Sequence, residues 1–207
     1  ENKAIFTIHL AETRKERVEC MKNNGMLPVE YLDALGVLTP NTLIAHAVWL
    51  TKAEIRLLAK RGVKISHNPI SNMKLAGGGV MPLPEMWEEG IIVGLGTDSV
   101  ASNNSMDMFE VMKGAGLIQK HHRWDPKTAP AQRILDMATI DGAKCIGMDH
   151  EIGSLEQGKY ADIISISLDN PRMQPPKNIV SNVVYAANGG CVDDVIINGK
   201  HVLSTPR

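Results

Sequence analysis

The sequence is poor in aromatic residues and has few cysteines, no long apolar run and almost no net charge. Aromatic side chains make up 4% of the 207 residues, but there are 11 methionines, so we expect a core of aliphatic and methionine side chains. Lys and Arg number 22 against 23 Asp and Glu, which leaves no excess positive charge for nucleic acid or an anionic membrane. Apolar runs are only strand-length, and no charged segment followed by an apolar one opens the chain, so we predict neither a transmembrane segment nor a signal peptide.

The three cysteines, Cys20, Cys145 and Cys191, are odd in number and far apart. No C-x-x-C pair occurs, which argues against a zinc ribbon and against a dithiol redox site. We therefore expect reduced thiols and a cytoplasmic location.

Four apolar, strand-like segments alternate with helical patterns in the first part of the chain. The segments cover residues 4–9, 43–46, 63–67 and 91–98, and the first of them reads as a buried strand. Helices are expected over 12–22, from the Thr51-x-x-Glu54 capping box onward, over 84–89, along a Met106/Phe109/Met112 face, and over 129–138 and 141–146. This alternation predicts βαβ units on a parallel sheet. Four strands cannot close a (β/α)8 barrel, so we expect either a longer chain or a second polypeptide to complete it.

The pattern changes after about Gly147. Residues 163–168 read as an alternating strand, and residues 194–203 read as a hairpin with Asn198-Gly199 as a primed turn. The chain is therefore expected to have a second, smaller part.

Each of the four strand-like segments ends in a residue that can take part in chemistry: His9, His46, His67 and Asp98. Taken singly, each has an ordinary explanation. His9 and Glu12 could be a satisfied histidine and a solvated carboxylate at a helix start. His46 and His67 could be core histidines bonded to backbone carbonyls, and Asp98 could be a helix N-cap. Together, three histidines and an aspartate at successive strand ends suit a metal-activated water with an acid and a base around it.

Five motifs occur in a fixed order along nearly the whole chain. They are H-L-A-E-T from residue 9, I-A-H from 44, S-H-N-P-x-S-N-M-K-L from 66, G-T-D-S-x-A-S-N-N from 96, and G-S-L-E-x-G-K-x-A-D from 153. The set resembles the amidohydrolase superfamily, specifically its 5′-methylthioadenosine/S-adenosylhomocysteine/5′-deoxyadenosine deaminase branch. The resemblance implies an α/β fold. Residues 1–150 would be the C-terminal half of a TIM-like (β/α)8 metal-dependent hydrolase barrel, and residues 151–207 the C-terminal part of a small flanking β-sandwich.

The resemblance also implies roles for individual residues. His9 and Asp98 would bind the metal, and Asp98 would also take the proton of the attacking water. Glu12 would protonate the purine ring, and His46 would polarise the hydroxide. Glu12, Asp98 and Ser102 would contact the substrate. His67 would lie on the wall of the pocket.

The implied enzyme is a hydrolase acting on C–N bonds of cyclic amidines, with one zinc ion per active site and iron or manganese as alternatives. It would convert 5′-methylthioadenosine, S-adenosylhomocysteine or 5′-deoxyadenosine to the inosine analogue plus ammonia, as a homo-oligomer. The alternatives are another amidohydrolase, such as a guanine deaminase or a chlorotriazine hydrolase-like enzyme, and a non-catalytic half-barrel remnant. The H-x-E and P-C-x-x-C pair of cytidine-type deaminases is absent.

One departure from the family pattern concerns the metal. The family's first two zinc ligands form an H-x-H pair, and no H-x-H occurs in these 207 residues. We therefore expect the chain to be a fragment that lacks the N-terminal half of the barrel and, with it, part of the metal site.

Overall fold

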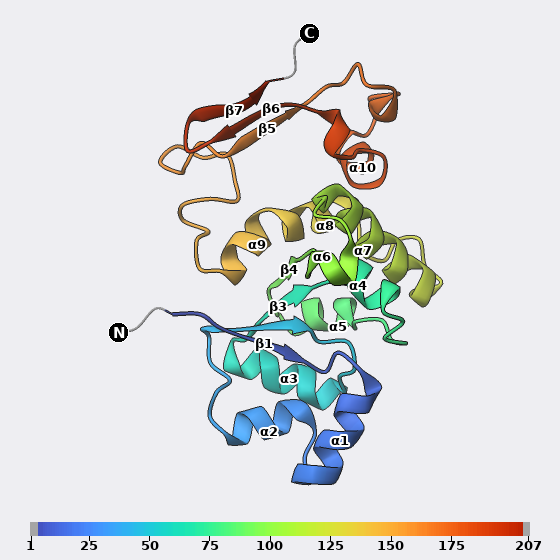
Figure 1. Ribbon diagram of the computed structural model, residues 1–207, viewed down its shortest axis with the longest axis vertical. Coiled ribbons are helices and arrows are strands. Elements are labelled where there is room, and N and C mark those ends of the chain that lie inside the picture. The colour runs from blue at the N-terminus through green and yellow to red at the C-terminus, as the bar shows by residue number, and fades with distance from the viewer. Residues whose placement is uncertain (1–3, 205–207) are drawn as a thin grey trace.

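The computed structural model describes residues 4–204, in which a parallel sheet and an antiparallel sheet are separated by helices (Figure 1). The parallel sheet has the order β1-β2-β3-β4, with β1 (Phe6–Leu10), β2 (Thr42–His46), β3 (Lys64–His67) and β4 (Val93–Leu95). Ala45 is paired with both His9 and Ser66, so the carboxyl ends of the strands lie at one edge. The predicted parallel sheet is confirmed.

Helices connect and cover these strands. They are α1 (Arg14–Asn24), α2 (Pro28–Ala34), α3 (Lys52–Arg61), α4 (Pro69–Lys74), α5 (Leu83–Glu88), α6 (Val100–Asn103), α7 (Met108–Arg123), α8 (Ala131–Ala138) and α9 (Ile140–Cys145). The predicted capping box starts α3: the Thr51 hydroxyl accepts from the Glu54 amide at 3.2 Å, and the Glu54 carboxylate accepts from the Thr51 amide at 2.9 Å. These reciprocal bonds satisfy amides that have no partner within the helix, which is why α3 begins there.

The core is aliphatic and rich in methionine, as predicted. Ile44 and Ile65 of the parallel sheet pack in one cluster with Met81, Met86 and Met137. Each of these five side chains is almost completely buried. The cluster joins the sheet to the helices and thereby fixes the ends of the strands relative to one another.

Two sequence expectations were wrong. The first strand was expected to be buried, but Phe6 is 45% exposed, because β1 lies at the edge of the sheet and pairs with β2 alone among residues 4–204. Met106 was expected on the buried face of a helix, but it is 69% exposed and precedes α7. Asp107 is the N-cap of α7, because its carboxylate accepts a hydrogen bond from the Phe109 amide at 2.8 Å. The helix therefore begins after Met106.

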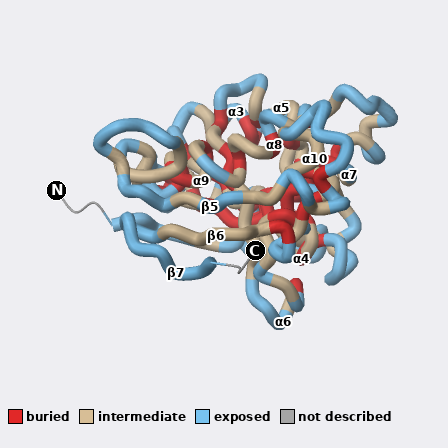
Figure 2. Tube along the Cα trace, turned by 90° about the horizontal axis from the view of Figure 1, so that it is seen from above, coloured by how far each residue is buried: buried red, intermediate tan, exposed pale blue. Residues whose placement is uncertain are grey.

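The C-terminal part is built on the antiparallel sheet β5-β6-β7, with β5 (Ile163–Ile166), β6 (Val192–Ile197) and β7 (Lys200–Ser204). Asn198 and Gly199 have φ values of 48° and 73°, which confirms the primed turn between β6 and β7. Every residue of β7 is exposed (Figure 2). Two short 3₁₀ turns, η1 (Pro171–Met173) and η2 (Gly189–Cys191), and the helix α10 (Ile179–Tyr185) complete this part.

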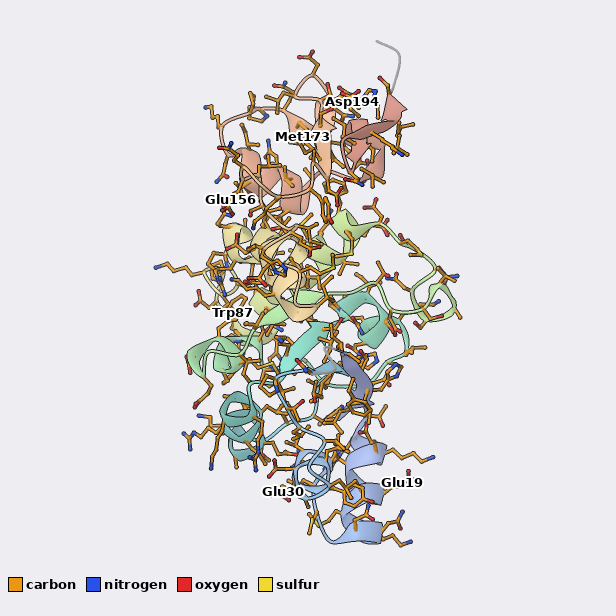
Figure 3. The ribbon with its side chains drawn as sticks, turned by 90° about the vertical axis from the view of Figure 1, so that its left-hand side faces the viewer. Glu19, Glu30, Trp87, Glu156, Met173 and Asp194 are labelled. Carbon is orange, nitrogen blue, oxygen red and sulfur yellow. The ribbon has the colours of Figure 1, made fainter. Side chains whose placement is uncertain are left out.

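Helix α10 was not expected from the sequence. It packs against α7 and α8 and so joins the C-terminal part to the rest of the chain. Met173 and Asp194 lie in the C-terminal part, at the opposite end of the molecule from Glu19 of α1 (Figure 3).

The three cysteines are free, as predicted, and two of them are buried. Among the described residues, no helix has both the length and the apolar character needed to cross a membrane.

Candidate active site

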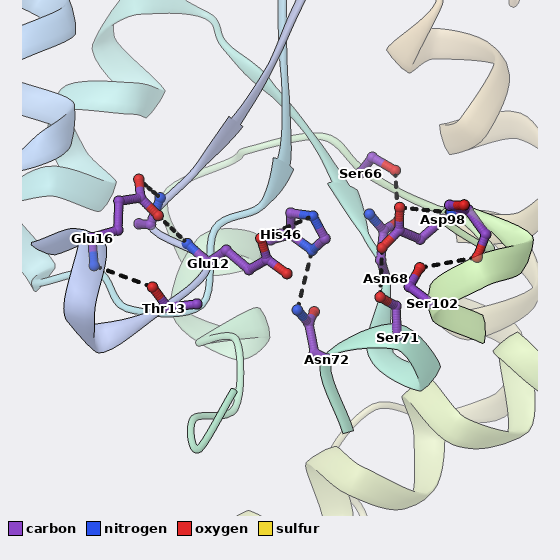
Figure 4. Close-up of polar contacts among 12 residues, drawn as sticks. Glu12, Thr13, Glu16, His46, Ser66, Asn68, Ser71, Asn72, Asp98 and Ser102 are labelled. Carbon is purple, nitrogen blue, oxygen red and sulfur yellow. Dashed lines mark hydrogen bonds and ion pairs between the residues drawn. The ribbon is translucent and has the colours of Figure 1, made fainter. Parts of the chain in front are cut away.

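The carboxyl edge of the parallel sheet gathers the candidate residues (Figure 4). His9 lies in β1, and Glu12 follows the end of that strand by two residues. His46 is the last residue of β2, and Asp98 follows the end of β4 by three residues. Because the strands are parallel and in register, the four side chains come from one edge of the sheet.

His9, Glu12 and His46 form a compact group. One nitrogen or carboxylate oxygen from each lies within 4.8 Å of those of the other two. The imidazole rings of His9 and His46 meet edge to face, with centroids 5.0 Å apart. The distance from His46 Nε2 to Glu12 Oε2 is 3.8 Å. His46 is buried, the Glu12 side chain is 25% exposed and His9 is exposed, so the group runs from the interior to the surface.

His46 is held by a side chain and not by the backbone carbonyl considered from the sequence. Its Nδ1 lies 3.1 Å from Asn72 Nδ2, whereas its Nε2 is buried without a hydrogen-bond partner among the described residues. The φ of His46 is 76° and that of Ala47 is 49°, so the chain turns sharply where the strand ends. Positive φ values at non-glycine residues cost energy and are often found at functional sites. The turn keeps the ring at the carboxyl edge.

Glu12 is positioned through its backbone by Glu16, which sequence reasoning missed. The Glu16 carboxylate accepts from the Ala11 amide at 2.7 Å and from the Glu12 amide at 2.9 Å. Thr13 caps α1 by accepting from the Glu16 amide at 3.1 Å, which fixes Glu16 in the first turn. The carboxylate of Glu12 is thereby left free to face His46 (Figure 4).

Asp98 is not a helix N-cap, because Ser99 holds that position at the start of α6. The Asp98 carboxylate accepts from the buried Ser71 hydroxyl at 2.5 Å and from the Ser99 amide at 2.7 Å. Burial acts to raise the pKa of Asp98, but the hydrogen bonds from Ser71, Ser99 and Ser102 outweigh it and hold that pKa below its ordinary value. Asp98 is therefore ionised at neutral pH. The Ser102 hydroxyl lies 2.9 Å from the Ser99 carbonyl as well, so its single proton is shared between that carbonyl and the Asp98 carboxylate.

His67 differs from the other strand-end residues. It is buried, neither ring nitrogen has a hydrogen-bond partner within residues 4–204, and it lines a cavity of about 10 Å³ with Met81 and Ile118. Burial, with a smaller effect from His46, lowers the pKa of His67 to about 3. The ring is therefore neutral.

A sequence model described as "Amidohydrolase family" matches residues 1–202. The chain belongs to the amidohydrolase family. This amidohydrolase chain is 47% identical, over 98% of its length, to the 5′-deoxyadenosine deaminase of Methanothermobacter thermautotrophicus, of which it covers 47%. It is 46% identical, over the same share, to the 5-methylthioadenosine/S-adenosylhomocysteine deaminase of Thermococcus sibiricus, of which it covers 47%. The resemblance to this branch is confirmed, and the chain spans about half the length of the curated relatives it matches.

Solved structures agree with this placement. A zinc-bound adenosine deaminase from Xanthomonas campestris superposes with a TM-score of 0.93 at 36% identity, covering 97% of this chain and 45% of that one. An atrazine chlorohydrolase from Arthrobacter aurescens complexed with zinc has a TM-score of 0.86 at 27% identity, covering 97% and 44%.

The residues of this amidohydrolase chain fit part of a metal site. Neutral imidazoles and carboxylates are the ligands that zinc takes in catalytic sites, and His9 and Asp98 offer one of each at the carboxyl edge of the sheet. The buried Nε2 of His46 has no hydrogen-bond partner among the described residues, so a polar group that binds in the site is needed to satisfy it. The compact group of possible ligands contains His9, Glu12 and His46, whereas the resemblance pairs His9 with Asp98. A ring nitrogen that carries a proton cannot bind a metal ion, so the position of the proton on His46 distinguishes the two sets of ligands.

Ser71 and Asn72 are neighbours on α4. Both belong to the motif that begins at residue 66, but no role was predicted for either of them from the sequence. The structure shows that Ser71 bonds to Asp98 and that Asn72 bonds to His46. Their proximity to the site could have been guessed from the motif, since they follow a strand end directly. Which group each one contacts required the packing of α4.

Proposed function

We propose that this chain is the C-terminal half of a zinc-dependent hydrolytic deaminase of adenosine-type nucleosides. In this proposal residues 1–150 form half of a (β/α)8 barrel, and residues 151–207 form part of a flanking β-sandwich. The observation that carries it is the convergence of His9, Glu12, His46 and Asp98 at the carboxyl edge of a parallel sheet, where barrel enzymes build their active sites.

The sheet topology supports the barrel. Within the described part of the chain, β1 and β4 each pair with a single neighbour, so the sheet has two open edges. The structures it resembles are more than twice as long and superpose over nearly all of this chain. We propose that the rest of the natural protein supplies the remaining strands and the H-x-H pair of ligands.

The proposed roles follow from burial and hydrogen bonding. His9 and Asp98 would hold the zinc ion, which when bound supplies an acidic water and with it a hydroxide near neutral pH. Asp98 is ionised and can accept the proton of that water. His46 presents Nε2 from the buried end of the site, where it can orient the reacting oxygen. Glu12 is close to His46 and partly exposed, and it can deliver a proton to a ring nitrogen of the substrate. Ser102 would contact the substrate beside Asp98.

The names of the relatives support the substrate class. Relatives at 43–47% identity are named 5′-deoxyadenosine deaminase or 5-methylthioadenosine/S-adenosylhomocysteine deaminase. Identity to the atrazine chlorohydrolase is lower, at 27%. We therefore favour 5′-substituted adenosines over triazines as substrates.

Activity assays on the complete natural protein test this function. Purified protein would be incubated separately with 5′-deoxyadenosine, 5′-methylthioadenosine, S-adenosylhomocysteine, guanine and atrazine. We expect ammonia and the inosine analogue from at least one of the adenosines, and loss of activity when a chelator removes the metal. Exclusive turnover of guanine or atrazine would overturn the substrate class. Absence of both turnover and bound metal would instead support the non-catalytic remnant.

A further inference from the structure

Asn72 is placed to control the chemistry of His46. It lies in α4, is 8% exposed, and its Nδ2 is 3.1 Å from His46 Nδ1. Its backbone is anchored at both groups: the amide donates to the Asn68 carbonyl, and the carbonyl accepts from the Gly77 amide, both at 3.1 Å. Its side chain is therefore held on one side of the imidazole (Figure 4).

The opposite side of the imidazole faces a carboxylate. Glu12 Oε2 lies 3.8 Å from His46 Nε2. A neutral imidazole carries one proton, on one of its two nitrogens. The Glu12 carboxyl oxygens present lone pairs toward Nε2, so a lone pair on Nε2 would be repelled, whereas a proton on Nε2 points at an acceptor. With the proton on Nε2, Nδ1 has a lone pair, and the group that faces it must donate. The amide nitrogen of Asn72 meets that requirement.

We propose that Asn72 is a positioning residue that holds His46 in the tautomer protonated on Nε2. This rests on the proposed function and assigns His46 a definite part in it. His46 is a hydrogen-bond donor to the oxygen on which negative charge develops, and it cannot be a metal ligand through Nε2, because that nitrogen has no free lone pair. Within the compact group, His9 is then the only metal ligand, whereas Glu12 transfers protons and His46 donates a hydrogen bond. The group is therefore not a three-ligand metal site.

The tautomer can be measured directly. The complete natural protein would be labelled with ¹⁵N-histidine, and the His46 signals would be assigned by their loss in His46→Gln. We expect Nε2 to carry the proton and Nδ1 to be unprotonated. In Asn72→Leu, which has no hydrogen-bonding group, we expect a mixture of the two tautomers. In Asn72→Asp, whose carboxylate only accepts, we expect a proton on Nδ1. Protonation of Nδ1 in the unaltered protein would overturn the proposal.

Kinetics separate positioning from folding. We expect Asn72→Leu to lower kcat by about 10- to 100-fold with KM nearly unchanged, the scale on which a partner that orients a functional histidine acts. Asn182→Leu is the matched control, because it also removes a donating side-chain amide, but the acceptors of Asn182 are the backbone carbonyls of Met173 and Pro175 in the C-terminal part. The control should lower the thermal midpoint and leave kcat unchanged. Equal losses of kcat in both variants would overturn the role of Asn72.

The two proposals can fail separately. If the unaltered protein deaminates no nucleoside, the proposed function fails, and the NMR signals still report the tautomer of His46. If deamination is found but His46 keeps its Nε2 proton and full kcat in Asn72→Leu, only the role of Asn72 fails. Aspartate has nearly the same shape as asparagine, so Asn72→Asp should fold. If the leucine variant does not fold, the tautomer of His46 is measured in Asn72→Asp instead.

Discussion

Glu16→Ala should disturb the proposed acid Glu12 without touching its side chain. The substitution removes an acceptor for the amides of Ala11 and Glu12, at 2.7 and 2.9 Å. A hydrogen bond to a charged group contributes about 1.5–3 kcal/mol, and partial exposure reduces this. For the two bonds together we expect a loss of about 2–4 kcal/mol in the free energy of unfolding. Ala11 has a φ of 52°, so its turn is strained and depends on these bonds.

The functional effect should exceed the effect of lost stability. Once the turn after β1 is freed, the carboxylate of Glu12 no longer keeps its distance to His46, and we expect kcat to fall by about 10-fold or more at a temperature where the variant is fully folded. The assays are denaturant unfolding and steady-state deamination with the complete natural protein.

Glu19→Ala is the matched control on the same helix. Glu19 makes one exposed ion pair with Lys15 at 3.7 Å, at the far end of the molecule from the C-terminal sheet (Figure 3). Such pairs contribute about 0–1 kcal/mol, so this variant should be close to the unaltered protein in stability and kcat. If Glu16→Ala and Glu19→Ala behave alike, Glu16 does not position Glu12, and the reasoning is refuted.

Three further predictions concern charged groups. Asp98→Asn should abolish turnover and weaken zinc binding, measured as metal content after dialysis; near-normal activity would remove Asp98 from the site. Glu12→Gln should keep its metal while the rate falls by about 10²-fold, the usual scale for a lost acid–base group, and normal turnover would exclude it from the mechanism. Burial acts to raise the pKa of Glu85, but its hydrogen bond and ion pair with Arg123 hold that pKa below its ordinary value. The stability that this pair contributes is complete above the unfolded pKa of about 4.3 and is lost as the pH falls through the lowered value. Arg123→Gln should therefore destabilise the protein at pH 7 and not at strongly acidic pH, and an equal loss at both would contradict the assignment.

The elements that depend on residues close together in the sequence could be predicted. Thr51 and Glu54 form the expected capping box, and Asn198-Gly199 forms the expected turn, since both depend on residues within a few positions. Elements held mainly by long-range packing were not predicted. Helix α10 begins after the N-cap Asn178, whose side chain accepts from the Ser181 amide at 3.1 Å, but a single cap before a seven-residue helix is a weak signal in the sequence, and the helix is stabilised by its contacts with α7 and α8.

For the candidate site, the strand ends were predictable and the contacts were not. The sequence alone placed His9, His46 and Asp98 after apolar segments, and the alternation of strands with helices was enough to expect them at one edge of a parallel sheet. The proposed metal and acid–base roles of these residues remain predictions.

The tertiary structure decided which groups face one another. Asn72 and Glu12 lie on opposite sides of His46, and Ser71 binds Asp98, although 26, 34 and 27 positions separate these partners along the chain. The protonation state of a buried imidazole or carboxylate depends on such neighbours and on its distance from water. The spacing of residues along the sequence gives neither the neighbours of a side chain nor its distance from water. The sequence therefore determined which residue types are at the site, and the fold determined their protonation states.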